Sequence, residues 1–251
     1  MYPVLFSIGR FSVHAYGFFL AVGFVFGLLR VYYIAPKYNL DKDKVVDLCV
    51  YILLGGIVGS RLLYVLTNLD KYTLKESFAI WNGGLSFHGG IILGIAVGII
   101  YAKVRKMNFW TVLDILSPSV CIGYGFTRIG CFLNGCCFGI ESSMPWAVKM
   151  ATPKGVCLCE PVQLYACAVS FLMFFILTKF EFKQKKPGYV FVWYLIFYGI
   201  YRFFIEFLRH HIAEDYIIFN ISGGQILSLI LIIAGLFLLF FRFFFKKDFK
   251  S

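Results

Sequence analysis

Seven long apolar runs constrain this chain more than any other feature, because roughly 17–25 apolar residues suffice to cross the ~30 Å hydrocarbon core of a bilayer as a helix. The runs are Val13–Ile34, Val45–Leu66, Leu85–Ala102, Phe109–Phe138, Val162–Leu177, Gly188–Leu208 and Ile217–Phe241. The fourth contains Pro118, so we expect a kink or an interfacial start there. The pattern predicts an all-α integral membrane protein with about seven transmembrane helices in a single domain spanning residues 1–251.

The composition excludes the common alternatives to a membrane protein. Hydrophobic residues make up 60% of the chain and charged residues only 15%, whereas about a quarter of the residues in a soluble domain are charged. An aromatic content of 20% excludes a disordered chain, which is poor in aromatic residues.

The net charge of +11 raises the question of a nucleic-acid partner, which the positions of the cations answer. With the N-terminus outside, the inner segments 35–44, 103–108, 178–187 and the C-terminal tail hold 14 of the 24 Lys and Arg residues. The outer segments hold 6. Cytoplasmic loops of membrane proteins carry such an excess, so the sequence predicts an outer N-terminus and a cytoplasmic C-terminus, and no nucleic-acid partner is needed.

Four arginines lie inside the apolar runs, where an ionisable group is costly and marks a functional site by default. Arg30 is near a cytoplasmic end and can extend to the interface. Arg61, Arg128 and Arg202 lie toward the outer ends of three runs. Other polar residues are expected at the same depth: His14, Tyr16, His88, Tyr198 and Glu206. Arginine binds phosphate through a planar fork of donors, so we expect an anionic ligand, and a lipid head group is the phosphate within reach.

A purely structural explanation is the alternative for these charges. Arg–Glu pairs can stabilise helix packing without any ligand, and Arg202 and Glu206, one helical turn apart, could form such a pair. The glycines at positions 55 and 59, and those at 90, 94 and 98, are four residues apart, which is typical of close helix packing in lipid. The stretch Trp81–Gly90 differs, because its glycine pairs flank a histidine; we expect an unwound segment that holds His88 in the pocket.

Five of the eight cysteines gather at or beyond the predicted outer face: Cys131, Cys136, Cys137, Cys157 and Cys159. Disulfides form outside the cytoplasm, so we expect one or two bonds that join Cys136 and Cys137 to Cys157 and Cys159. Free thiols without a role, or a catalytic or metal-binding role, are the alternatives. The spacing does not match paired C-x2-C zinc ligands, so we predict no metal site.

Motifs along nearly the whole chain resemble the bacterial phosphatidylglycerol–prolipoprotein diacylglyceryl transferase family. The segment Gly125–Gly135, GFTRIGCFLNG, is similar to the family signature G-R-x-G-N-F-x-N-x-E. Further similar segments are His14–Gly17, Gly59–Arg61, Gly83–Gly90, Pro161–Tyr165 and Tyr198–Phe207. Three positions depart from the family pattern: Cys131 replaces the first Asn of the signature, Cys136 replaces its Glu, and Glu160 replaces a His.

The resemblance implies a transferase of the bacterial cytoplasmic membrane whose active site faces the outer leaflet. The diacylglyceryl group of phosphatidylglycerol would move to the thiol of the lipobox cysteine of a preprolipoprotein, with release of glycerol 1-phosphate and without a metal or other cofactor. Arg128 and Arg202 would hold the phosphate, and His88 would be the general base, with Tyr16 and His14 nearby. An arginine-rich pocket that lowers the pKa of the acceptor thiol unaided is the alternative to this base.

Other residues would complete the substrate site implied by the resemblance. Asn134 and Glu206 would orient the arginines, and Arg61 would be a second phosphate contact or a gate. The remaining candidates for binding substrate are Tyr198, Gly89 and Gly139.

Three other functions stay open at the level of sequence. The cysteine departures permit a sister enzyme that uses the same lipid donor with a different acceptor. A small anion or lipid transporter would be expected to show an inverted repeat, and we find no convincing one. A thiol-based redox protein would leave the three buried arginines without a role.

Overall fold

The computed structural model describes residues 2–9, 11–69, 83–152, 155–183, 186–209, 216–218 and 221–241. The chain forms two compact units. The first unit combines Met1–Gly27 with Leu113–Ser251, and the second is Leu28–Val112. Our expectation of a single domain over 1–251 stays a prediction.

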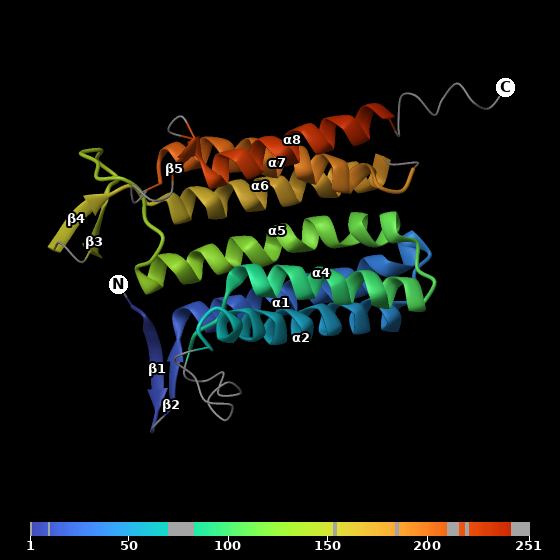
Figure 1. The fold of residues 1–251 in the computed structure, drawn as a ribbon, viewed down its shortest axis with the longest axis horizontal. Coiled ribbons are helices and arrows are strands. Elements are labelled where there is room, and N and C mark those ends of the chain that lie inside the picture. Colours follow the sequence, from blue (N-terminus) through green and yellow to red (C-terminus); the bar gives the residue numbers. More distant parts are fainter. Residues whose placement is uncertain are drawn as a thin grey trace. The chain divides into compact units, whose positions relative to one another are not determined.

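Six of the described helices are long and apolar enough to cross a membrane, which confirms the multi-pass, all-α architecture. They are α1 (Ala15–Ile34), α2 (Lys42–Leu66), α4 (Phe87–Val104), α5 (Phe109–Asn134), α6 (Val162–Lys183) and α7 (Tyr189–Phe207) (Figure 1). A seventh, shorter apolar helix is α8 (Gly223–Leu239), and a single 3-10 turn, Ala35–Tyr38, follows α1. The outer position of the N-terminus stays a prediction.

Three antiparallel hairpins, absent from the sequence prediction, complete the described elements. They pair β1 (Val4–Ile8) with β2 (Phe11–His14), β3 (Val148–Thr152) with β4 (Gly155–Cys159), and β5 (Tyr216–Ile218) with β6 (Ile221–Ser222). All three belong to the first unit and lie at one end of its helices, on the left in Figure 1.

Helix capping explains why two apolar runs yield shorter helices than predicted. The fourth run was expected to continue to Phe138, but α5 ends at Asn134 because Gly135 adopts a left-handed conformation with φ of 71°. The seventh run was expected to begin at Ile217, but α8 begins after Ser222, whose hydroxyl accepts the backbone N–H of Gln225 in a capping box.

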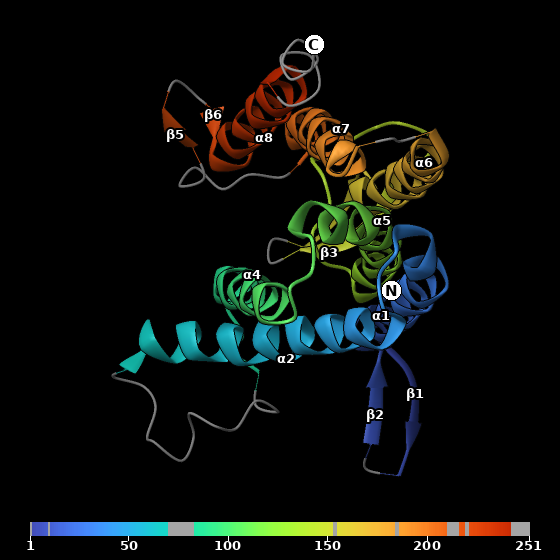
Figure 2. The same cartoon turned by 90° about the vertical axis from the view of Figure 1, so that its right-hand side faces the viewer.

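In the first unit, glycines and one buried carboxylate hold the helices together. A Cβ at Gly23 would lie 3.0 Å from the carbonyl oxygen of Gly123, so α1 and α5 are in close contact there. The α7 and α8 helices also lie side by side (Figure 2). Asp114, fully buried in α5, accepts hydrogen bonds from the backbone N–H groups of Gly188 at 2.6 Å and Phe191 at 2.8 Å. This carboxylate therefore caps the N-terminus of α7.

In the second unit, α2 and α4 pack through small residues. A Cβ at Gly59 would clash with the carbonyl oxygen of Gly89, and a Cβ at Gly89 would clash with that of Gly59. Only residues without side chains permit this approach, as the glycine spacing indicated.

Candidate functional site

A small, positively charged pocket lies in the first unit, where three arginines from different segments meet. Arg128 comes from α5, Arg202 from α7, and Arg209 from the residues after α7. Tyr201 and Ile205 line its wall. The other lining residues are Cys137, Val162 and Ala166. Its volume of about 10 Å³ is at the lower limit for a single water molecule.

Arg128 is positioned by an aromatic ring rather than by a carboxylate. Its guanidinium carbon lies 4.6 Å from the centroid of the Tyr124 ring. Its Nε atom is buried without a hydrogen-bond partner among the described residues. Burying a charged hydrogen-bond donor without an acceptor costs free energy, so this guanidinium is suited to bind an anion.

One acid, Glu206, holds the other two arginines. Its Oε2 atom lies 2.8 Å from Nη2 of Arg202 and 3.9 Å from Nη1 of Arg209. Its Oε1 atom accepts a hydrogen bond of 3.2 Å from the hydroxyl of Ser222. The carboxylate lies against Gly224 in the first turn of α8, where the helix dipole stabilises negative charge. The predicted Arg202–Glu206 ion pair is thus present, and Glu206 pairs with two of the three arginines that line the pocket.

An apolar groove between α6 and α7 adjoins the arginine pocket. The groove has a volume of about 480 Å³ and shares Tyr201 and Ile205 with the pocket. Its other lining residues are Tyr165, Val169, Leu172, Met173, Ile176, Phe197, Ile200, Phe204 and Leu208. The site therefore combines a cationic pocket with an adjacent apolar channel, which suits a molecule with an anionic head and a hydrocarbon tail.

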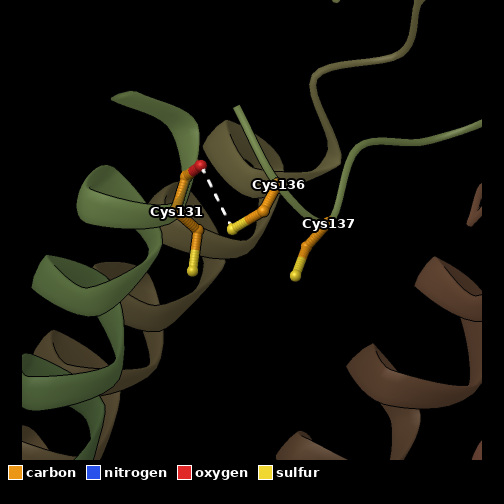
Figure 3. A group of neighbouring side chains, drawn as sticks. All are labelled: Cys131, Cys136 and Cys137. Carbon is orange, nitrogen blue, oxygen red and sulfur yellow. Dashed lines mark hydrogen bonds between the residues drawn. The ribbon is translucent and has the colours of Figure 1, made fainter. Parts of the chain in front are cut away.

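Three free cysteines gather beside the arginine pocket (Figure 3). The Sγ atoms of Cys131, Cys136 and Cys137 all lie within 4.8 Å of one another. A hydrogen bond with the Cys131 thiol, supported by the charges of Arg128 and Arg209, holds the pKa of the Cys137 thiol well below its usual range. Burial raises the pKa of the Cys136 thiol. The cluster therefore offers one thiol that ionises readily at the edge of the cationic pocket.

The predicted disulfides between the two cysteine pairs are wrong. A disulfide joins Cys157 to Cys159, whereas Cys136 and Cys137 are free. Residues two apart on a strand point to the same face, and the Cα atoms of this pair are 5.8 Å apart, within the usual range for a disulfide. The pairing is therefore local to β4.

Other predicted residues of the first unit lie around the thiol cluster and the tyrosines. Tyr16, at the start of α1, is close enough to interact electrostatically with the three thiols and with Arg128. His14 is exposed and pairs with Val4 in the first hairpin. Asn134 is exposed and hydrogen-bonds to Cys136, so its contact is with a thiol.

Tyr198 belongs to a cluster of tyrosines with Tyr124 and Tyr194. Its ring stacks on Tyr194 at 5.8 Å and meets Tyr124 edge-on at 6.1 Å. Because the Arg128 guanidinium lies over the Tyr124 ring, Tyr198 contributes indirectly to the position of Arg128.

Gly139 packs tightly against the backbone of Leu208 next to the pocket. A Cβ there would clash with the carbonyl oxygen of Leu208, and Gly139 forms a β-bridge with Arg209. This close approach brings the segment after α5 against the end of α7, which places Cys137 and Arg209 in the same pocket.

Glu160, one of the departures from the family pattern, is held as a carboxylate by neighbours. Its Oε2 atom accepts hydrogen bonds from Tyr165 at 2.6 Å and from Trp146 at 3.3 Å. Hydrogen bonds with Ser142 and Tyr165 lower the pKa of Glu160. Glu160 therefore fixes the segment before α6.

Three predicted site residues belong to the second unit. Arg61 donates hydrogen bonds to the carbonyl oxygens of Gly83 at 2.7 Å and Gly84 at 3.1 Å, so it shapes the segment before α4. His88 is exposed in the first turn of α4. Gly89 is buried against Gly59, which assigns it to helix packing. That His88 and Arg61 share a site with Arg128 stays a prediction.

Comparison with known proteins assigns the family. Residues 3–241 match the family model described as prolipoprotein diacylglyceryl transferase. The chain belongs to this family. The transferase family resemblance seen in the motifs of the sequence is thereby confirmed over nearly the whole chain.

Individual transferases of the family are similar along most of their length. A phosphatidylglycerol–prolipoprotein diacylglyceryl transferase of Aeromonas salmonicida is 38% identical over 93% of this chain and 87% of the relative. The transferase of the same description from Pseudoalteromonas translucida is 38% identical over 96% of this chain and 92% of its own. That from Clostridium tetani is 31% identical over 94% and 96%.

Some residues of the site were not expected from the sequence. Arg209 follows the end of its apolar run and was counted as a loop cation, and Tyr124 was one tyrosine among 16. Ser222 followed by a glycine pair and then Gln225 is a helix-start signal that identifies the N-terminus beside Glu206.

Proposed function

We propose that this protein transfers the diacylglyceryl group of phosphatidylglycerol to the lipobox cysteine of a prolipoprotein at the outer leaflet of the bacterial cytoplasmic membrane. Family membership supports the reaction, because the matched relatives carry that activity in their names. The observation in this chain that carries the proposal is the cationic pocket that adjoins an apolar groove through Tyr201 and Ile205.

The two parts of the site suit the two parts of the lipid. The phosphate would bind at Arg128 and Arg202, whose guanidinium groups form strong, charge-assisted hydrogen bonds to phosphate oxygens. An acyl chain would lie in the groove between α6 and α7. The pocket in this structure is small, so Arg202 would turn from Glu206 toward the phosphate when the lipid binds.

The chemical step is a displacement at the glycerol carbon that bears the phosphate. The acceptor thiol loses its proton, and its sulfur forms a bond to this carbon. The bond between that carbon and the phosphate oxygen breaks, and its electron pair leaves with glycerol 1-phosphate. The arginines stabilise the charge that develops on the leaving oxygen. We propose His88, exposed in the first turn of α4, as the group that accepts the thiol proton.

Substitution of the arginines tests the phosphate site. We expect Arg128→Ala and Arg202→Ala to lower the transfer rate by about 10²–10³-fold, the usual loss for a donor that stabilises transition-state charge. The rate is measured with purified protein in phosphatidylglycerol vesicles and a peptide containing a lipobox cysteine. Arg202→Lys keeps the charge next to Glu206 but loses the planar fork, so partial activity is expected.

Arg105→Ala is the matched control. Arg105 lies over the Tyr101 ring at the C-terminal end of α4, opposite the end that bears His88, and its loss is expected to leave the rate unchanged. Full activity in either alanine variant of Arg128 or Arg202 would exclude the phosphate site.

A different acceptor is the second candidate function. The observation that favours it is the presence of Cys131 and Cys136 where the family signature has Asn and Glu. In the same assay, release of glycerol phosphate without modification of the peptide would identify such an enzyme.

A further inference from the structure

The cysteines that replace two polar residues of the family signature form a three-sulfur cluster. Cys131 comes from the last turns of α5, and Cys136 and Cys137 come from the segment that follows (Figure 3). Cys131 is buried, Cys136 is half-buried and Cys137 is exposed. Among the described residues, these three cysteines are the group whose side-chain ligand atoms lie close enough together to hold one metal ion.

The end of α5 explains why sulfurs five residues apart meet. The backbone N–H of Cys136 donates to the carbonyl of Cys131 at 3.1 Å, and that of Gly135 donates to Phe132 at 3.1 Å. With Gly135 in the left-handed region, these two bonds define a Schellman motif, which folds the sixth residue back over the first. The Sγ atom of Cys136 consequently lies 3.6 Å from the carbonyl oxygen of Cys131.

Two further features fix the third sulfur and the turn. Cys137 has a φ of 62°, a left-handed conformation that is uncommon outside glycine, and this turns its side chain toward the other two. Gln163, fully buried in α6, donates from Nε2 to the carbonyl of Cys136 at 2.8 Å. The cluster is therefore held by backbone geometry and by a neighbouring helix.

Three converging thiols match the needs of a soft or borderline metal ion. Zinc binds thiolates at about 2.3 Å, which sets sulfurs about 3.8 Å apart in a tetrahedral site. Sulfurs that already lie within 4.8 Å of one another need only small side-chain rotations to reach that geometry. A Zn²⁺ ion with three thiolates carries one net negative charge, and Arg128 and Arg209 lie near enough to interact with Cys137.

We propose that Cys131, Cys136 and Cys137 bind a Zn²⁺ ion with an open fourth position beside the arginine pocket. Cys137 belongs both to the cluster and to the lining of that pocket, so a ligand in the fourth position lies next to the phosphate-binding arginines. An open position with three protein ligands is the arrangement found in catalytic zinc sites, whereas structural sites have four.

The use of this site rests on the proposed function. The acceptor thiol would give its proton to His88, the base proposed above, and its sulfur would occupy the fourth position as a thiolate. Its sulfur would then attack the glycerol carbon, the carbon–oxygen bond to the phosphate would break with its electron pair on oxygen, and the neutral thioether, a weak ligand, would leave the zinc. The lost Asn and Glu of the signature are thus replaced by groups that select and activate a thiol.

The test of binding measures zinc directly and is independent of transfer. Purified full-length protein is incubated with zinc chloride, freed of excess metal, and analysed for zinc per chain; cobalt replacement then reports thiolate ligation by its charge-transfer absorption. We expect one zinc ion per chain in the wild type and in Cys167→Ser, a control cysteine in α6 that is also free and lies outside the cluster. The triple serine variant of Cys131, Cys136 and Cys137 loses the zinc.

A single substitution, Cys137→Ser, tests the site without the risk that the triple variant fails to fold. Cys137→Ser changes an exposed side chain, so the protein is expected to fold, and its zinc affinity is expected to fall at least ~10-fold. Wild-type protein that retains no zinc, a disulfide between two of the three thiols in place of metal, or undiminished zinc in the triple variant would each overturn the site.

A separate measurement distinguishes this proposal from the proposed function. Removal of zinc by a chelator is expected to abolish modification of the peptide while binding of phosphatidylglycerol persists. Bound zinc in a protein that never transfers lipid would refute the proposed function and leave the metal site standing. Full transfer by zinc-free protein would refute the catalytic use of the metal.

Discussion

At the scale of single residues, Glu206 determines how the arginines are arranged. It is 3% exposed and contacts Arg202, Arg209 and Ser222 at once. The space for its carboxylate exists only because residue 224 is glycine, since a Cβ there would clash with Oε1. Glu206 therefore orients Arg202 and Arg209, whereas Arg128 lies against the Tyr124 ring.

We predict that Gly224→Ala impairs transfer more than it impairs folding. The added methyl group displaces the end of a flexible side chain, which costs little stability but turns Arg202 and Arg209 away from their present positions. A loss of about tenfold in rate, or about 1.4 kcal/mol, is expected, with a nearly unchanged thermal midpoint in detergent.

Gly123→Ala is the control for this prediction. A Cβ at Gly123 would lie 3.9 Å from the carbonyl oxygen of Gly23, an ordinary contact. If Gly224→Ala were as active as Gly123→Ala, the carboxylate would have no orienting role.

Residues of the site could be predicted from sequence only where they contrast with their surroundings. Arg128 and Arg202 are cations within apolar runs, and a position four residues from Arg202 identified Glu206. Arg209 lies just outside its run and carries no such contrast. The disulfide was mispredicted because sequence spacing alone does not say that Cys157 and Cys159 are on one strand.

At the scale of elements, Asp114 links two helices that the sequence treats as independent runs. It is fully buried in α5 and accepts hydrogen bonds from the backbone N–H groups of Gly188 and Phe191 at the start of α7. Those N–H groups have no partner within their own helix, as at the start of every α-helix. The contact therefore holds the helix that bears Arg202 against the helix that bears Arg128.

Asp114→Ala is predicted to destabilise the protein by about 1–3 kcal/mol, because two buried N–H groups lose their acceptor. The midpoint of unfolding in a denaturing-detergent titration measures this loss. Asp41→Ala removes an exposed cap, which accepts from Asp43 at 2.9 Å at the start of α2, and is expected to cost less. Equal effects of the two substitutions would show that the buried position of Asp114 adds nothing.

Apolar runs predicted the helices well because length and composition are enough to specify a membrane span. The ends were less accurate, since they depend on caps such as Gly135 and Ser222. The short hairpins were missed because strands of two to five residues leave little periodicity to detect.

At the scale of the molecule, the first unit contains the arginine pocket and the apolar groove, which are assigned to the lipid donor, and also the thiol cluster, which is assigned to the acceptor. The second unit contains His88, proposed as the proton acceptor. The family match covers residues 3–241 and therefore includes both units.

The most direct test of the central claim is to follow both products of transfer at once. Purified protein is reconstituted with phosphatidylglycerol labelled in its acyl chains, together with a peptide that contains a lipobox cysteine or, as control, serine in its place. We predict that label becomes attached to the cysteine peptide as a thioether, with an equal amount of glycerol 1-phosphate released, and that the serine peptide stays unlabelled. Absence of label on the cysteine peptide while the lipid is consumed, or no consumption of lipid at all, would contradict the account.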